Sequence, residues 1–307
     1  MSVLQWRDWS CTVRVVLADG RSVTEAPEPA LALRVERLLR DLMDDVALSA
    51  SRFRTDSDLT RVNAAAGRRL PVRRLTLDLV EVALDAARRT GGACDPTVGR
   101  PVLAAGYSAD IDVLRARGAI VDHAPCAPAD WTAVRVDREL GLLGVPTGLA
   151  LDLGATTKAW TADEGAARIA RAIDAPALVA LGGDVAVSGD GPAWPVQVSE
   201  HEGDPGPVVT LASGGIATSS TQGRRWATPD GERHHLIDPR TGGPTAGAFR
   251  TATVLASSCV EANTLSTAAL VWGGDAPGRL EPHAARLIDV TGTVVTTTGW
   301  PEAVLAA

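Results

Sequence analysis

Residues 149–173 read LALDLGATTKAWTADEGAARIARAI, and this stretch decides how the rest of the chain is interpreted. Its apolar residues alternate with others as far as Asp152-Leu153-Gly154, which predicts a strand that ends in a tight glycine turn. Apolar residues then recur at helical spacing from Ala162 onward, which predicts a helix. Thr156 or Thr157 is placed to cap that helix, because a hydroxyl can accept a hydrogen bond from a free backbone N–H.

A strand, a glycine turn and a helix N-terminus together make a natural anion site, since the free N–H groups and the positive helix end point the same way. Lys158 lies in the first helical turn, and it is the only lysine among the 30 Lys and Arg residues. An ammonium is a compact point charge, whereas a guanidinium is a wide planar fork. Lys158 is therefore a candidate phosphate ligand; the alternative is a surface lysine without a function. Neither GxxxxGK[ST] nor GxGxxG occurs in this stretch.

The composition is that of a soluble globular protein, with 307 residues, 45% hydrophobic and 22% charged. Neither an internal repeat nor a linker divides it, so we expect one domain over residues 1–307. A net charge of −7 argues against nonspecific binding of nucleic acid. No apolar run approaches a membrane span. The opening MSVLQWRDWS lacks a secretory signal, and the four scattered cysteines indicate reduced thiols, so we expect a cytoplasmic protein.

Strands and helices alternate irregularly along the chain, which predicts an α+β fold rather than repeated βαβ units. We expect helices over residues 28–48, 75–90 and 260–271 and a further helix from Thr97 onward. We expect strands over residues 12–18, 177–181, 185–188, 194–199, 208–212 and 251–256, two strands within 133–149, and a closing hairpin at 287–290 and 293–297. Residues 108–132 show no clear period and are interpreted as surface structure.

Three polar segments remain ambiguous when they are considered singly. Residues 51–63 are interpreted by default as a solvated connection; the alternative is a short helix capped by Ser57 or Asp56. Residues 214–220 are small and hydroxyl-rich, and form either a ligand-approach loop or an exposed loop. In residues 233–244, His234 and His235 point to opposite faces if the segment is extended. One of these histidines, with Asp238 nearby, is a candidate acid–base group; DPRTGGP is equally a plain turn sequence.

Seven segments, in order, resemble those of the ApbE family, the FAD:protein FMN transferases. Residues 51–63 resemble its S-x-Y/F…S-x-L-x-x-x-N segment, GACDPTVG at 92–99 its G-x-F-D-x-T-V-G, and LDLGATTKAW at 151–160 its D-L-G-G-x-x-K-G. LGGD at 181–184, ATSS at 217–220, HLIDPRTG at 235–242 and EANTLSTA at 261–268 resemble the remaining segments. The resemblance covers nearly the whole chain and implies a single ApbE-like domain of mixed sheets with packed helices and an FAD cleft.

The resemblance also implies a reaction. Members of the family cleave the pyrophosphate of FAD, place FMN on a Thr or Ser hydroxyl of a target flavoprotein and release AMP, with help from Mg²⁺. Such a transfer needs cations that neutralise phosphate charge and a base that takes the hydroxyl proton. Lys158 matches the first role and His235 the second, which implies that both are catalytic.

By the same resemblance, Asp95 and Asp152 match positions that hold FAD, and Phe53 matches an aromatic that can stack on a flat ring. The full cofactor set implied is Trp9, Phe53, Ala93, Cys94, Asp95, Asp152, Lys158, Thr218 and Leu236. The metal set implied is Ala155, Asn263 and Thr267, which offer a backbone carbonyl and two side-chain oxygens.

Four positions depart from the family pattern. Trp9-Ser10-Cys11 stands where the family has M-G-T, so Trp9 is either a flavin platform or part of the core. Cys94 replaces an aromatic, and Ala155 replaces a glycine whose carbonyl survives the change. Asn263 replaces a metal-binding Asp; since hard cations favour carboxylates, we expect weaker metal binding or a site completed by the FAD phosphates.

Three functions are therefore weighed: an FMN transferase, an FAD pyrophosphatase that uses water as acceptor, and a flavin-binding protein without catalysis. The variant Asn263→Asp separates them. If a carboxylate is the missing part of an enzyme, the change increases metal-dependent AMP release, measured by chromatography. Unchanged release from a protein that binds FAD well would argue against an enzyme limited by its metal site.

Overall fold

The computed structural model describes residues 1–20, 27–117, 121, 126–301 and 304–305, and an eight-stranded sheet is its largest element. In sheet order the strands are β1 (Ser2–Asp8), β2 (Cys11–Leu17), β6 (Ala177–Leu181), β7 (Asp184–Ser188), β10 (Gly215–Ser220), β13 (Phe249–Ala256), β14 (Ala284–Asp289) and β15 (Val294–Thr296). All neighbours in this sheet are antiparallel. The α+β prediction is confirmed.

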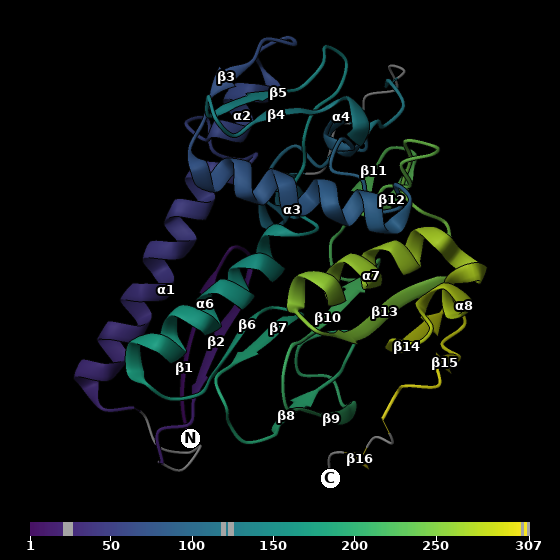
Figure 1. Cartoon of the computed structure of the whole chain (residues 1–307). Helices are drawn as coiled ribbons and strands as arrows, with labels where there is room; N and C mark the ends of the chain where they lie inside the picture. Colours follow the sequence, from purple (N-terminus) through teal and green to yellow (C-terminus); the bar gives the residue numbers. More distant parts are fainter. Residues whose placement is uncertain (21–26, 118–120, 122–125, 302–303, 306–307) are drawn as a thin grey trace.

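Three small sheets and the helices complete the fold. The small sheets are β3 (Leu70–Pro71) with β5 (Leu142–Gly144) and β4 (Arg135–Asp137); β11 (Arg225–Thr228) with β12 (Gly231–His234); and β16 (Val304–Leu305) with β9 (Pro207–Leu211) and β8 (Trp194–Gln197). The α-helices are α1 (Pro29–Ala50), α2 (Asp58–Asn63), α3 (Arg74–Thr90), α4 (Gly99–Ala104), α5 (Ile111–Arg117), α6 (Thr157–Ile173), α7 (Cys259–Trp272) and α8 (Ala276–Leu280). Figure 1 shows α6 and α7 in front of the large sheet, with α1 beside α6 and α3 crossing above.

Both faces of the large sheet are buried, because successive side chains of a strand point to opposite faces. On β6, Val179 joins the core cluster beneath α1 and α6, whereas Leu178 joins a second cluster. That second cluster contains Trp194 of β8 and Val209 of β9. The β8–β9 hairpin therefore covers the face opposite the helices, and the near-continuous apolar run of β6 follows from this two-sided burial.

The segment ahead of α6 differs from its prediction. Residues 149–153 do not form a strand; one parallel bridge joins Ala150 to Val98. The pairing is very close, because a Cβ placed on Gly99 would lie 2.7 Å from the carbonyl oxygen of Ala150. Thr156 occupies the N-cap position of α6 but makes no side-chain cap. The Thr157 hydroxyl donates instead to the carbonyl of Leu153 at 2.7 Å, so neither threonine caps as expected.

Two further predictions are corrected. Residues 214–220 are mostly strand β10, in the interior of the large sheet between β7 and β13, because their hydroxyls are paired with neighbouring strands and with α7. Strand β1 and the β11–β12 hairpin are absent from the predictions, since few of their residues are fully buried and no long apolar run marks them. The remaining predicted helices and strands are confirmed within a few residues.

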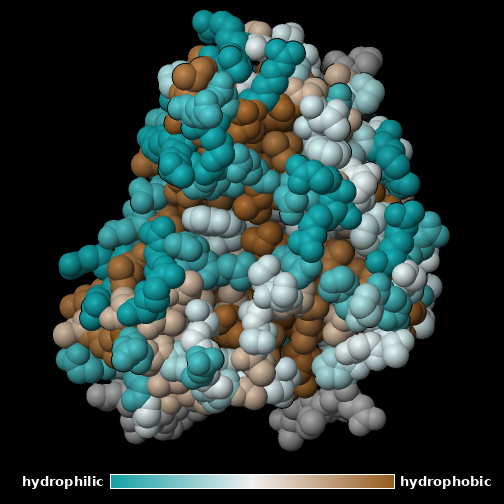
Figure 2. All heavy atoms as spheres, viewed as in Figure 1, coloured by the Kyte–Doolittle hydropathy of each residue, from teal (hydrophilic) through white to brown (hydrophobic). Residues whose placement is uncertain are grey.

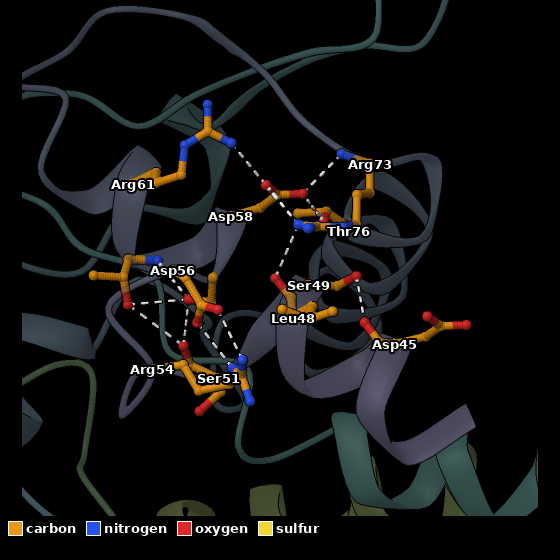
Figure 3. A network of polar contacts seen from close by, with 12 residues as sticks. Asp45, Leu48, Ser49, Ser51, Arg54, Asp56, Asp58, Arg61, Arg73 and Thr76 are labelled. Carbon is orange, nitrogen blue, oxygen red and sulfur yellow. Dashed lines mark hydrogen bonds and ion pairs between the residues drawn. The ribbon is translucent and has the colours of Figure 1, made fainter. Parts of the chain in front are cut away.

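Residues 51–63 are not a loose connection but contain α2, held by a polar network (Figure 3). Ser57 caps the helix by accepting a hydrogen bond from the N–H of Thr60 at 3.1 Å. The buried Asp58 accepts hydrogen bonds from the N–H of Arg73 and the hydroxyl of Thr76, both at 2.8 Å. This network fixes α2 to the start of α3, because a buried carboxylate requires donors.

Asn63, at the end of α2, is bound to the segment before α6. Its amide nitrogen donates to the carbonyl of Leu151 at 2.9 Å, and its oxygen accepts from the N–H of Leu151 at 2.8 Å. Leu151 is 1% exposed, so water does not readily replace these bonds. The side chain of Asn63 thus takes the place of a neighbouring strand.

We expect Asn63→Ala to lower the free energy of unfolding by about 2 kcal/mol, because a buried N–H and C=O both lose their partner. Denaturant titration followed by circular dichroism measures this. Asn63→Asp is the matched variant: it keeps an acceptor for the Leu151 N–H but has no donor for the carbonyl. A stability loss below about 0.5 kcal/mol for Asn63→Ala would contradict the role given to these bonds.

Candidate functional site

Lys158 is seated beside the turn that joins β1 to β2. Its ammonium nitrogen donates to the carbonyl oxygen of Trp9 at 3.2 Å. Trp9 and Ser10 have φ values of 46° and 54°. These are left-handed backbone conformations, which residues other than glycine adopt at a cost in free energy. The Ser10 hydroxyl donates to a carboxylate oxygen of Asp110, which ties the turn to the chain just before α5. Trp9 thus makes two contacts. Its backbone carbonyl binds Lys158, and its partly buried ring packs against the main core.

Lys158 is partly buried, and its surroundings shift its pKa. Burial lowers the pKa of its ammonium group, and the nearby charge of Arg224 lowers it further. Cys11 and Asp184 act in the opposite direction on the same pKa. Arg224 is a second cation of the site that the sequence analysis missed. One of many arginines in the chain, it carries no local signal of its own.

The β6–β7 turn adjoins the β1–β2 turn. Gly182 has a φ of 66°, and a Cβ at this position would lie 3.2 Å from the Cβ of Cys11. The turn Gly182-Gly183 leads directly into Asp184, the first residue of β7. Residues 11 and 184 are thereby brought to the same end of the sheet as Lys158.

Asp152 is held by an arginine that the sequence analysis did not consider. The Nε of Arg52 lies 2.9 Å from Oδ2 of Asp152, and the other carboxylate oxygen accepts from the N–H of Gly154 at 2.8 Å. The guanidinium of Arg52 stacks between Phe53 and Tyr107, 4.3 Å from each ring centroid. Its Nη2 atom is buried without a hydrogen-bond partner. An unused donor beside aromatic rings is what a polar, flat ligand requires.

Aromatic rings extend from this arginine to His235. Tyr107 stacks on Trp226 with centroids 5.0 Å apart, and its edge faces His235 at 6.3 Å. Phe53 is 46% exposed, so part of its ring is free to stack on a ligand. Tyr107 and Trp226 lie in segments where the sequence shows no motif, which explains why they were not predicted.

His235 has the properties of a neutral base. Burial lowers its pKa well below the usual range, and the charges of Arg224, His234 and Lys158 lower it further. Its Nδ1 atom is buried without a hydrogen-bond partner. An unprotonated ring nitrogen without a donor can accept a proton.

His234 and Asp238 are engaged elsewhere. The Nε2 atom of His234 lies 3.0 Å from the carbonyl oxygen of Thr245. Asp238 forms an ion pair with Arg240 at 2.7 Å and accepts its backbone N–H. The sequence-based option of an Asp238–histidine pair is therefore wrong: Asp238 stabilises its own turn.

Asp95 and its neighbours lie in a buried turn. One oxygen of Asp95 accepts from both the N–H and the hydroxyl of Thr97 at 2.7 Å. Burial raises the pKa of Asp95, and these hydrogen bonds oppose the shift. Burial also raises the pKa of the Cys94 thiol to about 12, so this thiol is not a nucleophile. Ala93 packs in a small cluster with α7.

A group of oxygen atoms lies between β7, β10 and α7. The amide nitrogen of Asn263 donates to Oδ1 of Asp184 at 2.6 Å, and its oxygen lies 3.4 Å from the hydroxyl of Thr267. The hydroxyl of Ser219 lies 3.0 Å from that of Thr267 and 2.8 Å from that of Ser266. Asn263 and Thr267 are thus together, as expected from their spacing on one helix.

Asp184 is the charged member of this group. Burial raises the pKa of Asp184, while the hydrogen bond from Asn263 and the charges of Lys158 and Arg224 lower it. Carboxylate, amide and hydroxyl oxygens suit hard cations such as Mg²⁺. Within the described residues no group of three or more His, Cys, Asp and Glu could hold a metal. Because all of these donors are oxygen atoms, the set suits Mg²⁺ or Mn²⁺ better than metals that prefer thiolate or imidazole ligands.

Three predicted site residues have mainly backbone or packing roles here. Ala155 lies in the turn that precedes α6, and its side chain is partly buried. Thr218 on β10 shares a hydrogen bond of 2.9 Å with Thr253, and its N–H donates to the carbonyl of Gly183 at 3.0 Å. Leu236 packs in the cluster beneath α7 and β13.

A cavity of about 430 Å³ opens elsewhere, between α3 and α7. None of the predicted site residues lines it, and its Arg138 is paired with Asp78 at 2.6 Å. Figure 2 shows hydrophilic side chains over much of this face. We therefore place the candidate site at the ends of β2, β7 and α6 rather than in this cavity.

Known proteins are similar to this chain over most of its length. A family model described as the ApbE family matches residues 8–286. The FAD:protein FMN transferase of Klebsiella pneumoniae (strain 342) is 30% identical over 262 residues, covering 82% of this chain and 73% of that protein. The FAD:protein FMN transferase of Vibrio cholerae is 28% identical over 265 residues, covering 81% of this chain and 75% of that protein.

Solved structures share the fold. The ApbE protein of Thermotoga maritima superposes with a TM-score of 0.80 at 23% identity, covering 97% of both chains. The Pseudomonas stutzeri flavinyl transferase ApbE superposes with a TM-score of 0.76 at 22% identity, covering 97% of this chain and 95% of that one.

The lowered pKa of His235 predicts a dependence of stability on pH. Between its folded pKa and about 6.5, only the unfolded chain binds the proton, so acid favours unfolding. From pH 7.5 to pH 5.5, we expect the parent to lose about 1 kcal/mol more unfolding free energy than His235→Gln. Urea titrations at both pH values measure this, and His201→Gln, at an exposed position, is the matched control. Equal losses for the parent and His235→Gln would show that the ring is not buried in its neutral form.

Proposed function

This chain belongs to the ApbE family, and we propose that it is a flavin transferase that moves FMN from FAD onto a Ser or Thr hydroxyl of a target flavoprotein. The observation that carries the proposal is the arrangement around His235. The Nδ1 atom of His235 is buried without a hydrogen-bond partner, and its ring lies beside the ring of Tyr107. The positive charges of Lys158 and Arg224 lower the pKa of this histidine. A base, cations and a surface for a flat ring are the parts that this reaction needs.

The proposed reaction is a phosphoryl transfer in one step. The acceptor hydroxyl oxygen attacks the FMN phosphorus of FAD, and the bond from that phosphorus to the oxygen of AMP breaks. The proton of the hydroxyl passes to Nδ1 of His235, which has no hydrogen-bond partner in the absence of a substrate. AMP leaves with the electron pair of the broken bond. FMN is then joined to the acceptor through a phosphoester.

The cations of the site act on the pyrophosphate. Lys158 and Arg224 neutralise its charge, and the N-terminus of α6 adds free N–H groups that no side chain caps. A divalent cation bound by the carbonyl of Ala155 and the side chains of Asn263 and Thr267 would stabilise the charge of the transition state. Its support is the donor set described above, which suits Mg²⁺.

The flavin needs a surface on which a flat ring can lie. Phe53 and the Arg52–Tyr107 stack offer a face for the isoalloxazine or adenine ring, with the buried Nη2 of Arg52 as a donor. In the described part of the chain, no helix has the length and apolar character needed to cross a bilayer.

We expect Lys158→Ala and His235→Ala each to lower AMP release by about 10²-fold or more, because each removes a group that acts in the transition state. The assay incubates the purified chain with FAD, Mg²⁺ and an acceptor flavoprotein, and measures AMP and FMN by chromatography. Intact mass spectrometry of the acceptor detects the covalent FMN. Arg168→Ala, an exposed cation on the same helix as Lys158, is the matched control.

The three functions give different products in this assay. Covalent FMN on the acceptor with equal AMP supports the transferase. AMP and free FMN without an acceptor would indicate a pyrophosphatase, and retained FAD without AMP would indicate a binding protein. Full activity of Lys158→Ala or His235→Ala would remove the role proposed for that residue.

A further inference from the structure

Asp184 is a buried carboxylate that lacks a partner of opposite charge. It is 7% exposed, and its hydrogen bond of 2.6 Å comes from the neutral amide of Asn263. Among the described residues, no cationic side chain lies within ion-pair distance of it. Buried carboxylates in proteins are normally paired with a cation or bound to a metal, because an isolated buried charge is costly. Asp184 therefore needs a positive charge that this structure does not supply at contact.

Oxygen atoms from three elements lie close together at Asp184. Asn263 and Thr267 come from α7, Ser219 from β10 and Asp184 from β7, and each lies within hydrogen-bond distance of at least one other member. All four residues are 7–8% exposed. The cluster thus presents a carboxylate, an amide and hydroxyls in one place, without a thiol or an imidazole.

The two nearby cations are committed elsewhere. Lys158 donates to the carbonyl of Trp9, and in the proposed function Lys158 and Arg224 face the pyrophosphate. Once an anionic substrate is bound, Lys158 and Arg224 neutralise the charge of its phosphates. The negative charge of Asp184 then has no cation of the protein to neutralise it.

We propose that Asp184 is the carboxylate ligand of the divalent cation and that Asn263 is the neutral ligand beside it. Asn263 on α7 has no negative charge, and in this proposal Asp184 on β7 supplies the carboxylate of the metal site. The proposal rests on the cation of the proposed function, but it concerns binding and is tested without FAD.

The contact between the two side chains explains why only one of them is charged. Two carboxylates at 2.6 Å would repel each other in the absence of a cation. An amide instead donates a hydrogen bond and holds the carboxylate in place. A flip of the Asn263 amide exchanges its nitrogen and oxygen, and it then turns two oxygens toward a common point. The pair is therefore stable without a metal and can still bind one.

Binding of Mn²⁺ alone, followed by the loss of its free electron paramagnetic resonance signal, tests the proposal. We expect Asp184→Asn to weaken Mn²⁺ binding at least roughly tenfold, because a hard cation loses its carboxylate. Asp163→Asn is the matched control: Asp163 is a partly buried acid near the site, but its oxygens accept the N–H groups of Cys259 and Val260 at 2.9 and 3.0 Å. We expect its affinity to change less than about threefold.

Two more variants protect the test against a folding defect in Asp184→Asn. The exchange variant Asp184→Asn/Asn263→Asp keeps one carboxylate and one amide, so we expect Mn²⁺ affinity within about threefold of the parent. Asn263→Asp alone places two carboxylates together. We expect it to melt at a lower temperature than the parent without metal and to regain the difference with Mn²⁺. Circular dichroism confirms that each variant is folded.

Several results would overturn the proposal: a parent chain that does not bind Mn²⁺, a folded Asp184→Asn that binds as tightly as the parent, or an equal loss in Asp163→Asn. A folded exchange variant that does not bind would do the same. FAD binding, measured by flavin fluorescence without a divalent cation, is independent of these results. Mn²⁺ binding that depends on Asp184, in a chain that neither binds nor cleaves FAD, would leave this inference standing and remove the proposed function.

Discussion

The partly buried positive charge of Lys158 is the constraint on which the site depends. An ammonium group that is largely removed from water must be stabilised by nearby acceptors and opposite charges. The structure provides the carbonyl of Trp9 at 3.2 Å and the field of Asp184. The left-handed turn at Trp9 and Ser10 aims that carbonyl, so local backbone strain is compensated by a contact with a charge. A phosphate is the ligand that would complete this balance.

The position of Lys158 in turn depends on backbone contacts between segments far apart in the chain. Asn63 hydrogen-bonds both backbone groups of Leu151, and Gly99 packs against the carbonyl of Ala150. These contacts fix the residues that enter α6, although no continuous strand is present there. Asn63 and Gly99 therefore act on the site through the backbone of the segment that leads into α6. Asn63 and Ser57 in particular are structural residues.

Buried polar groups of the site fall into two kinds. Asp58 and Asp163 have their oxygens filled by donors of the protein, and they hold elements together. The Nη2 of Arg52 and the Nδ1 of His235 are buried without a hydrogen-bond partner, and the carboxylate of Asp184 has a neutral donor but no cation in contact with it. Unsatisfied polar atoms cost free energy in the absence of a ligand. Nε1 of Trp6 and Nδ1 of His234 are also buried without a partner, so the site is marked by where such atoms lie, beside the aromatic rings and the cations, and not by the missing partner itself.

Much of the fold follows from sequence by itself, because helices α1, α3 and α6 and strand β2 have the periodicity of their buried faces. The sequence also shows a single lysine, Lys158, at the start of a helix, and seven segments in the order found in the ApbE family. The sequence misplaced residues 149–153 and 214–220, since whether an apolar or small-residue run becomes a strand depends on its neighbours. Only the tertiary structure joins Arg52 to Asp152, Tyr107 to Trp226 and Asp184 to Asn263. These partners lie 100, 119 and 79 residues apart in the sequence, and no local pattern encodes such separations.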